Sequence, residues 1–352
     1  MADTETILSE MLATVSPEHD KSPGSFIYDS LKPAAERFAK TDQSLDNAKE
    51  KLDIDNLSGD ELAQRIYERT GIERKAATYA HGSATVVGTG TINVGDLFET
   101  IGGIQFRSTE TKSIAVSGTV AVSAVVAGAG GNVPANTITL FPVTIPGFTS
   151  VNNPAPTIDG FEAESDADLL ARYYEHIRTP ATSGNKAHYK NWAKEVPGVG
   201  DARVIPLWAG DNTVKVVIID SDKKPASESL VAAVQKYIDP GITGEGDGAA
   251  PLGAFATIVS ATGVNINITV SVTLSTGYTQ QQAVDSIKAN LSQYLKEIAF
   301  VESIVSYAKV GATILDSEGI EDYSGLQLNG GITNVTIGNE QVAVLGTVAV
   351  NV

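Results

Sequence analysis

Charged side chains are distributed very unevenly along this 352-residue chain, and their distribution indicates how it divides into domains. Residues 80–157 carry only five acidic or basic side chains and are otherwise rich in Gly, Ala, Val, Ser and Thr, whereas the flanking segments are strongly charged. At roughly 100–200 residues per domain, a chain of this length holds more than one domain. The composition predicts four modules: a helical region at 1–78, a β-rich domain at 79–157, an α+β domain at 158–260 and a C-terminal α+β domain at 261–352.

The chain is strongly acidic and contains no cysteine. Its 42 acidic residues outnumber the 25 basic ones, which gives a formal net charge of −17. Nucleic acids and anionic membrane surfaces are bound through clustered Lys and Arg, so we expect no nucleic acid and no membrane among its partners. The absence of cysteine excludes disulfides, thiol catalysis and cysteine-ligated metal sites, and it favours synthesis in a reducing cytosol. We expect no signal peptide, and no apolar stretch reaches the ~18 residues that a membrane-spanning helix needs.

The charged N-terminal block is predicted to be helical. Apolar spacing indicates a first helix that Pro17 ends, a long helix that begins near Ser25 with a kink or restart at Pro33, and a third helix opened by a capping box of Ser58 and Glu61. The long helix carries a stripe of apolar residues along one side. This stripe either packs within its own domain or binds partner helices in an intermolecular bundle, since a helix this long must bury its apolar side. The residues of that stripe, our candidate partner-helix interface, are Ile27, Leu31, Phe38, Leu45 and Leu52.

The weakly charged block is predicted to be a small β-domain. Larger aliphatic residues occupy alternate positions from Ile114 to Val126, a period of two that indicates one long, half-buried strand. Shorter strands are predicted at 85–89, 104–108 and 137–140, separated by glycine pairs and an Asn-Val-Pro turn. The scarcity of charge would also suit burial against neighbouring subunits, although a plain β-sandwich explains it equally well.

The second half of the chain alternates between helices and strands, which predicts a mixed α+β, multidomain fold. A faint repeat, a helix followed by Pro197-Gly198 and a helix followed by Glu318-Gly319, suggests two related modules. The terminal segments 332–337 and 341–350 are predicted to pair as a hairpin joined at Gly338-Asn339. Helices are expected at 165–178, 186–196, 227–238, 279–297 and 302–315, and strands at 202–206, 213–220 (buried and central), 255–260 and 264–274.

No pattern in the sequence predicts catalysis or ligand binding. The four histidines lack metal-ligand spacing, and Asp166 and Asp168 are better explained as charges favoured at a helix N-terminus. The glycine-rich run at 128–131 is not followed by a helix, as a phosphate-binding loop would be, and the G-x-S-x-G nucleophile motif is missing. We therefore expect no enzymatic activity, no catalytic residues, no cofactor and no metal.

Two short motifs are more informative. The first is Gly-Gly-Asn-Val-Pro-Ala-Asn-Thr-Ile at 130–138, and the second runs from Thr-Ser-Gly-Asn at 182–185 to Pro-Gly-Val at 197–199. With the block that starts at Asp159, and with Gly-Ile-Glu-Asp-Tyr and Leu-Asn-Gly near the end, they resemble, in order, the motifs of the baseplate J-like family of contractile phage tails. Glu162 stands where that family usually has Asp. Each motif residue also has a structural explanation, so we interpret Gly131, Asn132, Pro134, Gly184, Asn185, Tyr189, Trp192 and Gly198 as fold determinants.

The resemblance implies a structural protein of the baseplate wedge, in a phage tail or a phage-tail-like bacteriocin. Its implied partners are further copies of itself in wedge and ring contacts, a tail protein I-like wedge partner, and sheath-initiator or hub proteins of the tail. It would be assembled in the bacterial host cytoplasm and located in the tail particle. Coupling attachment to sheath contraction would require interfaces with two discrete packings of similar free energy.

Two other functions stay open on the sequence alone. A receptor-binding or adhesin module of a tail fibre could use the Gly/Ser/Thr/Val-rich block, although a fibre should show repeats and none is evident. A tail-associated cell-wall hydrolase would need a pair of carboxylates in a cleft. Glycan binding or peptidoglycan cleavage by the purified protein would identify these functions.

Overall fold

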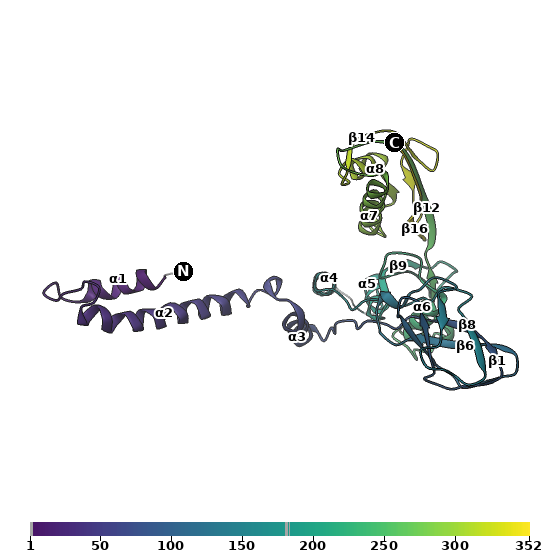
Figure 1. Cartoon of the computed structure of the whole chain (residues 1–352), viewed down its shortest axis with the longest axis horizontal. Helices are drawn as coiled ribbons and strands as arrows, with labels where there is room; N and C mark the ends of the chain where they lie inside the picture. The colour runs from purple at the N-terminus through teal and green to yellow at the C-terminus, as the bar shows by residue number, and fades with distance from the viewer. Residues whose placement is uncertain (1–2, 180–181, 183) are drawn as a thin grey trace. The chain divides into compact units, whose positions relative to one another are not determined.

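A computed structural model describes residues 3–179, 182 and 184–352 of the chain. The chain divides into two compact units, each described here by itself. Unit 1 comprises the chain up to Arg74 together with Ser165–Tyr174, and unit 2 comprises Lys75–Glu164 and the chain from Glu175 onward. Figure 1 gives the element labels used below. Within the described residues, no helix combines the length and apolar character needed to cross a bilayer.

Unit 1 begins with two helices that lie beside one another, α1 (Thr4–Thr14) and α2 (Phe26–Glu50) (Figure 1). Asp3 and Ser25 cap them by accepting hydrogen bonds from backbone N–H groups of the first turn. The restart predicted at Pro33 does not occur, because α2 continues through it. Pro33 lies on the exposed side of the helix, where water can bond the carbonyl that loses its N–H partner.

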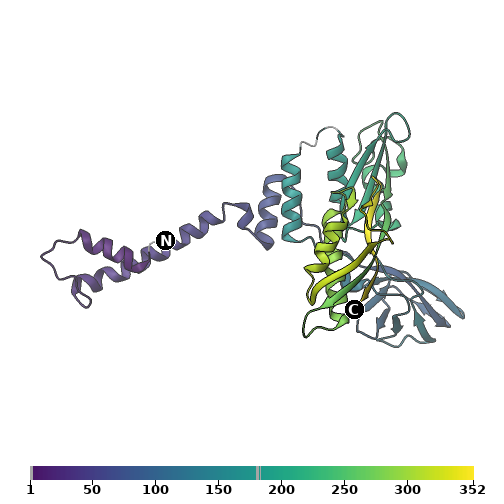
Figure 2. The ribbon, with the colours of Figure 1, turned by 90° about the horizontal axis from the view of Figure 1, so that it is seen from above.

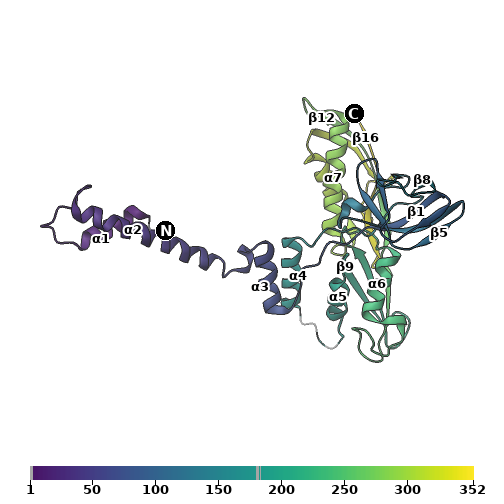
Figure 3. The same ribbon diagram turned by 60° about the horizontal axis from the view of Figure 1, so that its bottom comes forward.

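The rest of unit 1 is a pair of helices, α3 (Gly59–Thr70) and the first part of α4 (Asp166–Arg178), preceded by the short helix η1 (Ile54–Asn56). Figures 2 and 3 show α3 and α4 side by side. The predicted capping box is wrong, because the side chain of Ser58 makes no capping hydrogen bond. Asp166 Oδ2 accepts the N–H of Gly59 at 2.9 Å instead, so a residue remote in sequence caps α3. The pair buries Ile54, Leu57, Leu62, Ile66, Leu169 and Tyr173.

Unit 2 opens with a six-stranded antiparallel sheet of strand order β7-β3-β4-β6-β1-β8, which we call the barrel domain. The single strand predicted at 114–126 is wrong. β5 ends at Ile114 and β6 begins at Ser117, because β5 pairs with β2 whereas β6 pairs with β1, and the exposed Val116 lies in the bend between them. The strands are β1 (His81–Gly88), β2 (Gly90–Ile92), β3 (Leu97–Thr100), β4 (Gln105–Ser108), β5 (Lys112–Ile114), β6 (Ser117–Ala124), β7 (Ile138–Leu140) and β8 (Phe148–Asn152), with a 3-10 turn η2 (Ala129–Gly131).

The central domain is a three-stranded sheet with helices α5 and α6 packed against it. β10 lies in the middle, as predicted, antiparallel to β9 and parallel to β11. α6 makes the crossover between the two parallel strands, and its N-cap Ser227 accepts a hydrogen bond from Leu230 N. The elements are α5 (Lys186–Glu195), β9 (Val199–Pro206), β10 (Thr213–Asp220), α6 (Glu228–Ile238), η3 (Pro240–Ile242) and β11 (Phe255–Ser260).

The C-terminal domain is a second three-stranded sheet, of order β14-β12-β16, against which α7 packs (Figure 3). The predicted hairpin of 332–337 with 341–350 is wrong: β15 pairs with β13, and β16 pairs in parallel with β12. Pairing with β12 lets β16 bury Val342 and Val350, which a hairpin with the two-residue β15 could not do. The elements are β12 (Thr262–Leu274), α7 (Gln280–Ile298), β13 (Ile304–Val305), α8 (Tyr307–Leu315), β14 (Ile320–Leu328), β15 (Val335–Thr336) and β16 (Gln341–Asn351).

These elements confirm the predicted mixed α+β, multidomain fold class. Two details of the C-terminal domain were not predicted. α8 begins five residues later than expected, because Ile304-Val305 form β13 and Ser306 caps the helix. β14, an edge strand of the sheet, follows α8 directly and was missed altogether.

Candidate functional site

The described residues contain no cluster of three or more His, Asp or Glu side chains that could hold a metal ion. The arrangement most similar to a catalytic triad joins His81, Asp159 and Ser229 beside a cavity of about 250 Å³. His81 Nε2 lies 3.2 Å from Asp159 Oδ2, and the Ser229 hydroxyl donates to the same carboxylate oxygen. In a Ser–His–Asp triad the imidazole lies between serine and carboxylate. Here the carboxylate occupies the middle, so the imidazole is not placed to take a proton from the serine.

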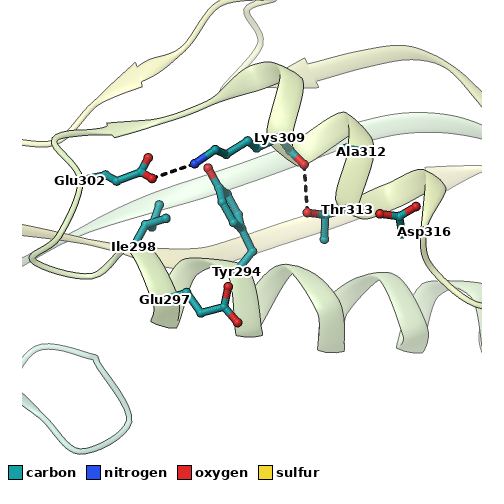
Figure 4. Close-up of a pocket in the computed structure, with 8 residues that line it drawn as sticks. All are labelled: Tyr294, Glu297, Ile298, Glu302, Lys309, Ala312, Thr313 and Asp316. Atoms are coloured by element: carbon teal, nitrogen blue, oxygen red, sulfur yellow. Dashed lines mark hydrogen bonds and ion pairs between the residues drawn. The ribbon is translucent and has the colours of Figure 1, made fainter. Parts of the chain in front are cut away.

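A second cavity, of about 380 Å³, lies between α7 and α8 (Figure 4). Lys309 Nζ pairs with Glu302 Oε1 at 2.7 Å across its mouth, and the Tyr294 hydroxyl accepts the N–H of Ser306. The remaining acids at the rim are Glu297 and Asp316, and the Thr313 hydroxyl donates to the Lys309 carbonyl. The described residues that line this cavity include no histidine, and its lysine is already paired with Glu302.

The first sequence motif closes the base of the barrel domain. Asn132 forms two hydrogen bonds with the buried backbone of Gly160: its Nδ2 donates to the carbonyl at 2.6 Å, and its Oδ1 accepts the N–H at 2.9 Å. A Cβ on Gly131 would lie 2.9 Å from the Cβ atoms of both Ala80 and Ala124, so only glycine fits there. Pro134 contributes its carbonyl, which accepts a hydrogen bond from Asn153 Nδ2.

Sequence reasoning missed two buried polar residues that complete this base, Asn153 and Thr157. Asn153 Oδ1 accepts the N–H groups of Thr137 and Ile138, at 2.9 and 2.8 Å. The Thr157 hydroxyl donates to the Gly131 carbonyl and accepts the N–H of Val133. Their contacts cross loops, so the sequence carried no local signal for them.

The second motif organises the start of the central domain around α5. Asn185 Oδ1 caps the helix by accepting the N–H of His188 at 2.8 Å. The imidazole of His188 stacks on Trp192 at 3.9 Å between ring centroids, and Tyr189 meets the same indole edge-on at 5.1 Å. Burial, and secondarily the carboxylate of Asp239, raise the pKa of Tyr189. Ser183, part of the resemblance, lies outside the described residues.

The two glycines of the second motif stand at positive φ where side chains would collide. Gly184 has φ 76°, and a Cβ there would lie 2.9 Å from Pro251. Gly198 has φ 92°, and a Cβ there would lie 2.8 Å from the ring of Phe161. Phe161 comes from the end of the barrel segment and packs into the core of the central domain. Both glycines therefore occupy positions where a larger side chain would collide with its surroundings.

The apolar stripe of α2 divides into a covered part and an uncovered part. Leu31 packs against α1, and Ile27 is half-buried. Phe38 and Leu45 are 55% and 53% exposed, and Leu52, just beyond the end of the helix, is 70% exposed. The apolar cluster between α1 and α2 ends at Ala39. No residue between 40 and 53 is buried.

Sequence reasoning also missed the period of this stripe. Leu31, Phe38, Leu45 and Leu52 recur every seven residues, and Ile27, Ala34 and Ala48 occupy the alternate apolar positions of the same heptad. A strict seven-residue repeat is the seam of a coiled coil, whereas a helix that packs on a globular core has a wider apolar face. α2 continues unbroken through Pro33 and carries Leu31, Phe38 and Leu45 of this seam, whereas Leu52 follows its end.

The architecture defines a modular α+β protein that combines a helical unit, a barrel domain and two three-stranded domains. Models of three domains of one family match the chain: the baseplate J-like protein barrel domain at residues 80–160, the central domain at 181–260 and the C-terminal domain at 266–351. The chain therefore belongs to the baseplate J-like family, which confirms the resemblance. It is a structural component of a phage-tail baseplate.

Relatives match over most of their length. The chain is 35% identical to the protein YqbT of Bacillus subtilis (strain 168), over 98% of this chain and 96% of that one. It is 34% identical to the phage-like element PBSX protein XkdT of the same organism, over 98% and 97%. It is 30% identical to baseplate protein gp47 of Escherichia phage Mu, over 70% and 71%. A solved baseplate structure of the anti-feeding prophage aligns at 12% identity and a TM-score of 0.39, too low to establish a shared fold.

Proposed function

We propose that this chain is a non-enzymatic scaffold protein of a baseplate wedge. Copies of it would join one another and a tail protein I-like partner, and six wedges would surround the hub of a contractile tail. The names of two relatives support this proposal: one is a baseplate protein of phage Mu, and the other belongs to the phage-like element PBSX. Assembly in the host cytoplasm and location in a tail particle belong to the same proposal.

The observation that carries the proposal is the uncovered heptad seam of α2. An isolated helix of two or three turns is barely stable in water, so the segment after Ala39 needs tertiary contacts that its own unit does not supply. Burying Phe38, Leu45 and Leu52 in a bundle would contribute on the order of 5 kcal/mol. That gain is large enough to make a partner helix a requirement for the folded state of this segment.

Charges beside the seam favour a parallel bundle that contains a second copy of α2. In a parallel pair, a residue at the g position of one heptad faces the e position of the next heptad on the partner. Here that rule places Arg37 of one copy opposite Asp42 of the other, and it opposes no two like charges along α2. The proposed bundle therefore joins copies of this chain, with room for a further helix because the alternate seam positions hold the small side chains of Ala34, Thr41 and Ala48.

Co-purification of the assembled wedge tests this proposal. We expect Phe38→Asp or Leu45→Asp to abolish recovery of the second copy and of the wedge partner, because each places a charge in the seam. The matched control is Gln43→Asp, which adds the same charge to the outer side of the same helix. Intact assembly with Phe38→Asp, or equal loss with Gln43→Asp, would count against the seam.

The absence of enzymatic activity is a separate part of the proposal. The arrangement of His81, Asp159 and Ser229 supports it, because the carboxylate separates the serine from the imidazole. We expect the purified protein to leave peptidoglycan uncut. Peptidoglycan cleavage that Ser229→Ala abolishes would refute the absence of enzymatic activity. It would leave the proposed α2 bundle unaffected.

A further inference from the structure

The outer edge of strand β11 is closed by side chains along its first half. β11 lies at an edge of the central sheet, so one side of its backbone has no neighbouring strand. Asp239 Oδ2 accepts the N–H of Ala256 at 2.9 Å. Gln235, in the last turn of α6, donates from Nε2 to the Ala256 carbonyl and accepts the N–H of Ile258 at Oε1, at 2.8 and 2.9 Å. A sheet edge whose backbone groups are occupied in this way is protected from pairing with another strand.

The second half of the same edge is open. The N–H of Ala261 donates to the Ile218 carbonyl of β10, so the odd-numbered residues of this stretch direct their backbone groups at β10 and the even-numbered residues direct theirs outward. Within the part of the chain that the structure describes, no residue bonds the carbonyl of Ile258 or the N–H and carbonyl of Ser260. Three backbone groups at the end of β11 therefore face outward without partners.

A groove of about 410 Å³ runs beside this open stretch, between β11 and the first half of α6. Ile258 and Val231 give it an apolar lining, with Ile258 buried and Val231 half-buried. Among the described residues that line it, Glu228 alone carries a charge. Unpaired strand groups beside a groove for side chains are the features with which a sheet edge binds an extended peptide.

We propose that the open end of β11 binds an extended segment of a different protein of the baseplate, which adds one short strand to the central sheet. The backbone of that segment bonds Ser260 and the Ile258 carbonyl, one apolar side chain fills the groove, and a Lys or Arg faces Glu228. Because Gln235 already holds the N–H of Ile258, the added strand ends there. The inference rests on the proposed function only in taking its partner from the baseplate.

A second copy of this chain fits the edge less well. Two β11 strands paired about a two-fold axis would set Ser260 of each copy against Ile258 of the other. Gln235 occupies the N–H of Ile258 in both copies, so half of the hydrogen bonds of that pairing would be lost. Each copy also carries a net charge of −17 and repels the other. Charge complementarity, to the groove and to the whole chain, therefore favours a partner segment with basic side chains.

Ser260→Pro tests the backbone contact, and Ser260→Ala is its matched control. Proline removes the outward N–H and is tolerated at a sheet edge, whereas alanine keeps the N–H and removes only the hydroxyl. We expect Ser260→Pro to keep the melting temperature of the parent and to be recovered in purified tail particles about tenfold less, with Ser260→Ala recovered like the parent. Full recovery of a folded Ser260→Pro would overturn the inference, and so would an equal loss with Ser260→Ala.

A second pair of variants leaves the strand intact, in case Ser260→Pro does not fold. Ala232→Lys places a cation in the groove, where it repels a basic partner, and Ala233→Lys adds the same charge at the next exposed position of α6, outside the groove. We expect only Ala232→Lys to reduce recovery. Equal recovery of the two variants would overturn the inference. If the parent chain is not recovered in tail particles either, the proposed function fails, and this inference fails with it.

Amide hydrogen exchange identifies the occupant. In the isolated full chain the Ser260 amide should exchange rapidly, and in the tail particle it should exchange at least about tenfold more slowly. The Ala261 amide, which bonds β10, should be slow in both and serves as the internal reference. No slowing at Ser260 on assembly would overturn the inference. Protection of Ser260 in the concentrated isolated chain, lost in Ser260→Pro, would identify a second copy as the occupant and overturn the proposed partner.

Discussion

The barrel domain and helix α2 show two opposite solutions for apolar side chains. The barrel sheet buries Phe98, Phe106 and its aliphatic residues in a closed core of its own. α2 is 25 residues long and buries only Ala35, while Phe38 and Leu45 face solvent. The difference indicates that the barrel is complete as a single chain, whereas α2 is one component of a structure that other helices must finish.

Truncating one phenylalanine in the barrel domain and one in α2 should give the largest difference in the free energy of unfolding between the two regions. Phe98 is fully buried, with Phe141 5.9 Å away between ring centroids, so Phe98→Ala should lower the free energy of unfolding by about 3–5 kcal/mol. Phe38→Ala should change it by no more than about 0.5 kcal/mol in the isolated protein. Urea unfolding measures both. Similar losses for the two variants would mean that α2 already has a core.

The hydrogen bonds at the base of the barrel give the next largest effect. Asn132→Ala leaves the buried N–H and carbonyl of Gly160 without partners, which should cost about 2–4 kcal/mol of unfolding free energy. Asn132→Asp keeps the acceptor but sets a carboxylate oxygen against the Gly160 carbonyl, so it should cost at least as much. Denaturant unfolding of the two variants checks the order. If Asn132→Ala has the stability of the parent, the motif does not determine the fold.

The buried carboxyl group of Asp220 in unit 2 should make the free energy of unfolding depend on pH. Burial, followed by the nearby carboxylate of Asp222, raises the pKa of Asp220 to about 6. The native state then holds this proton more tightly than the unfolded chain, so Asp220 destabilises the fold increasingly as the pH rises from about 4 to above 6. Asp220→Asn should therefore stabilise the protein by about 1–3 kcal/mol at pH 8 and not at pH 3. Equal gains at both pH values would contradict the assignment to this carboxyl group.

Asp166 in unit 1 should show the opposite sign and the smallest effect. The N–H of Gly59, and then Arg74, lower the pKa of Asp166. Its contribution to stability is therefore present above the ordinary aspartate pKa and is lost as the pH falls through the lowered value. Asp166→Ala should lower the melting temperature of the helices slightly at pH 7, and the difference should close near pH 2. A gap that persists at pH 2 would point to a packing defect instead.

Local signals in the sequence were sufficient for elements whose boundaries depend on neighbouring residues. The start of α2 near Ser25, the start of α7 and the apolar run that predicted a central β10 are all features of the segments themselves. The cap of α3 did not follow, because Asp166, far away in sequence, replaces Ser58. The partner of β16 is equally remote, so the sequence suggested a nearby hairpin in its place.

The residues of the candidate site divide in the same way, into those with a local sequence signal and those whose contacts are remote in sequence. The stripe of α2 and the motif residues were found in the sequence because each has a local spacing or turn pattern. Other contacts join residues that only the folded chain brings together. Asn132 forms hydrogen bonds with the backbone of Gly160, and Arg203 donates a hydrogen bond to the Gly338 carbonyl. The seven-residue period of the stripe was readable in the sequence and passed unnoticed among more general helical spacings.

Hydrogen exchange of the segment at residues 40–52 tests the central claim most directly. The account predicts rapid amide exchange in the isolated chain, at a concentration where it is monomeric, and slow exchange once the chain is part of the assembled tail particle. Phe38→Asp, which should not assemble, should show rapid exchange whether or not the other tail proteins are present. Strong protection in the isolated monomer, or no gain in protection on assembly, would contradict the claim that neighbouring helices complete α2.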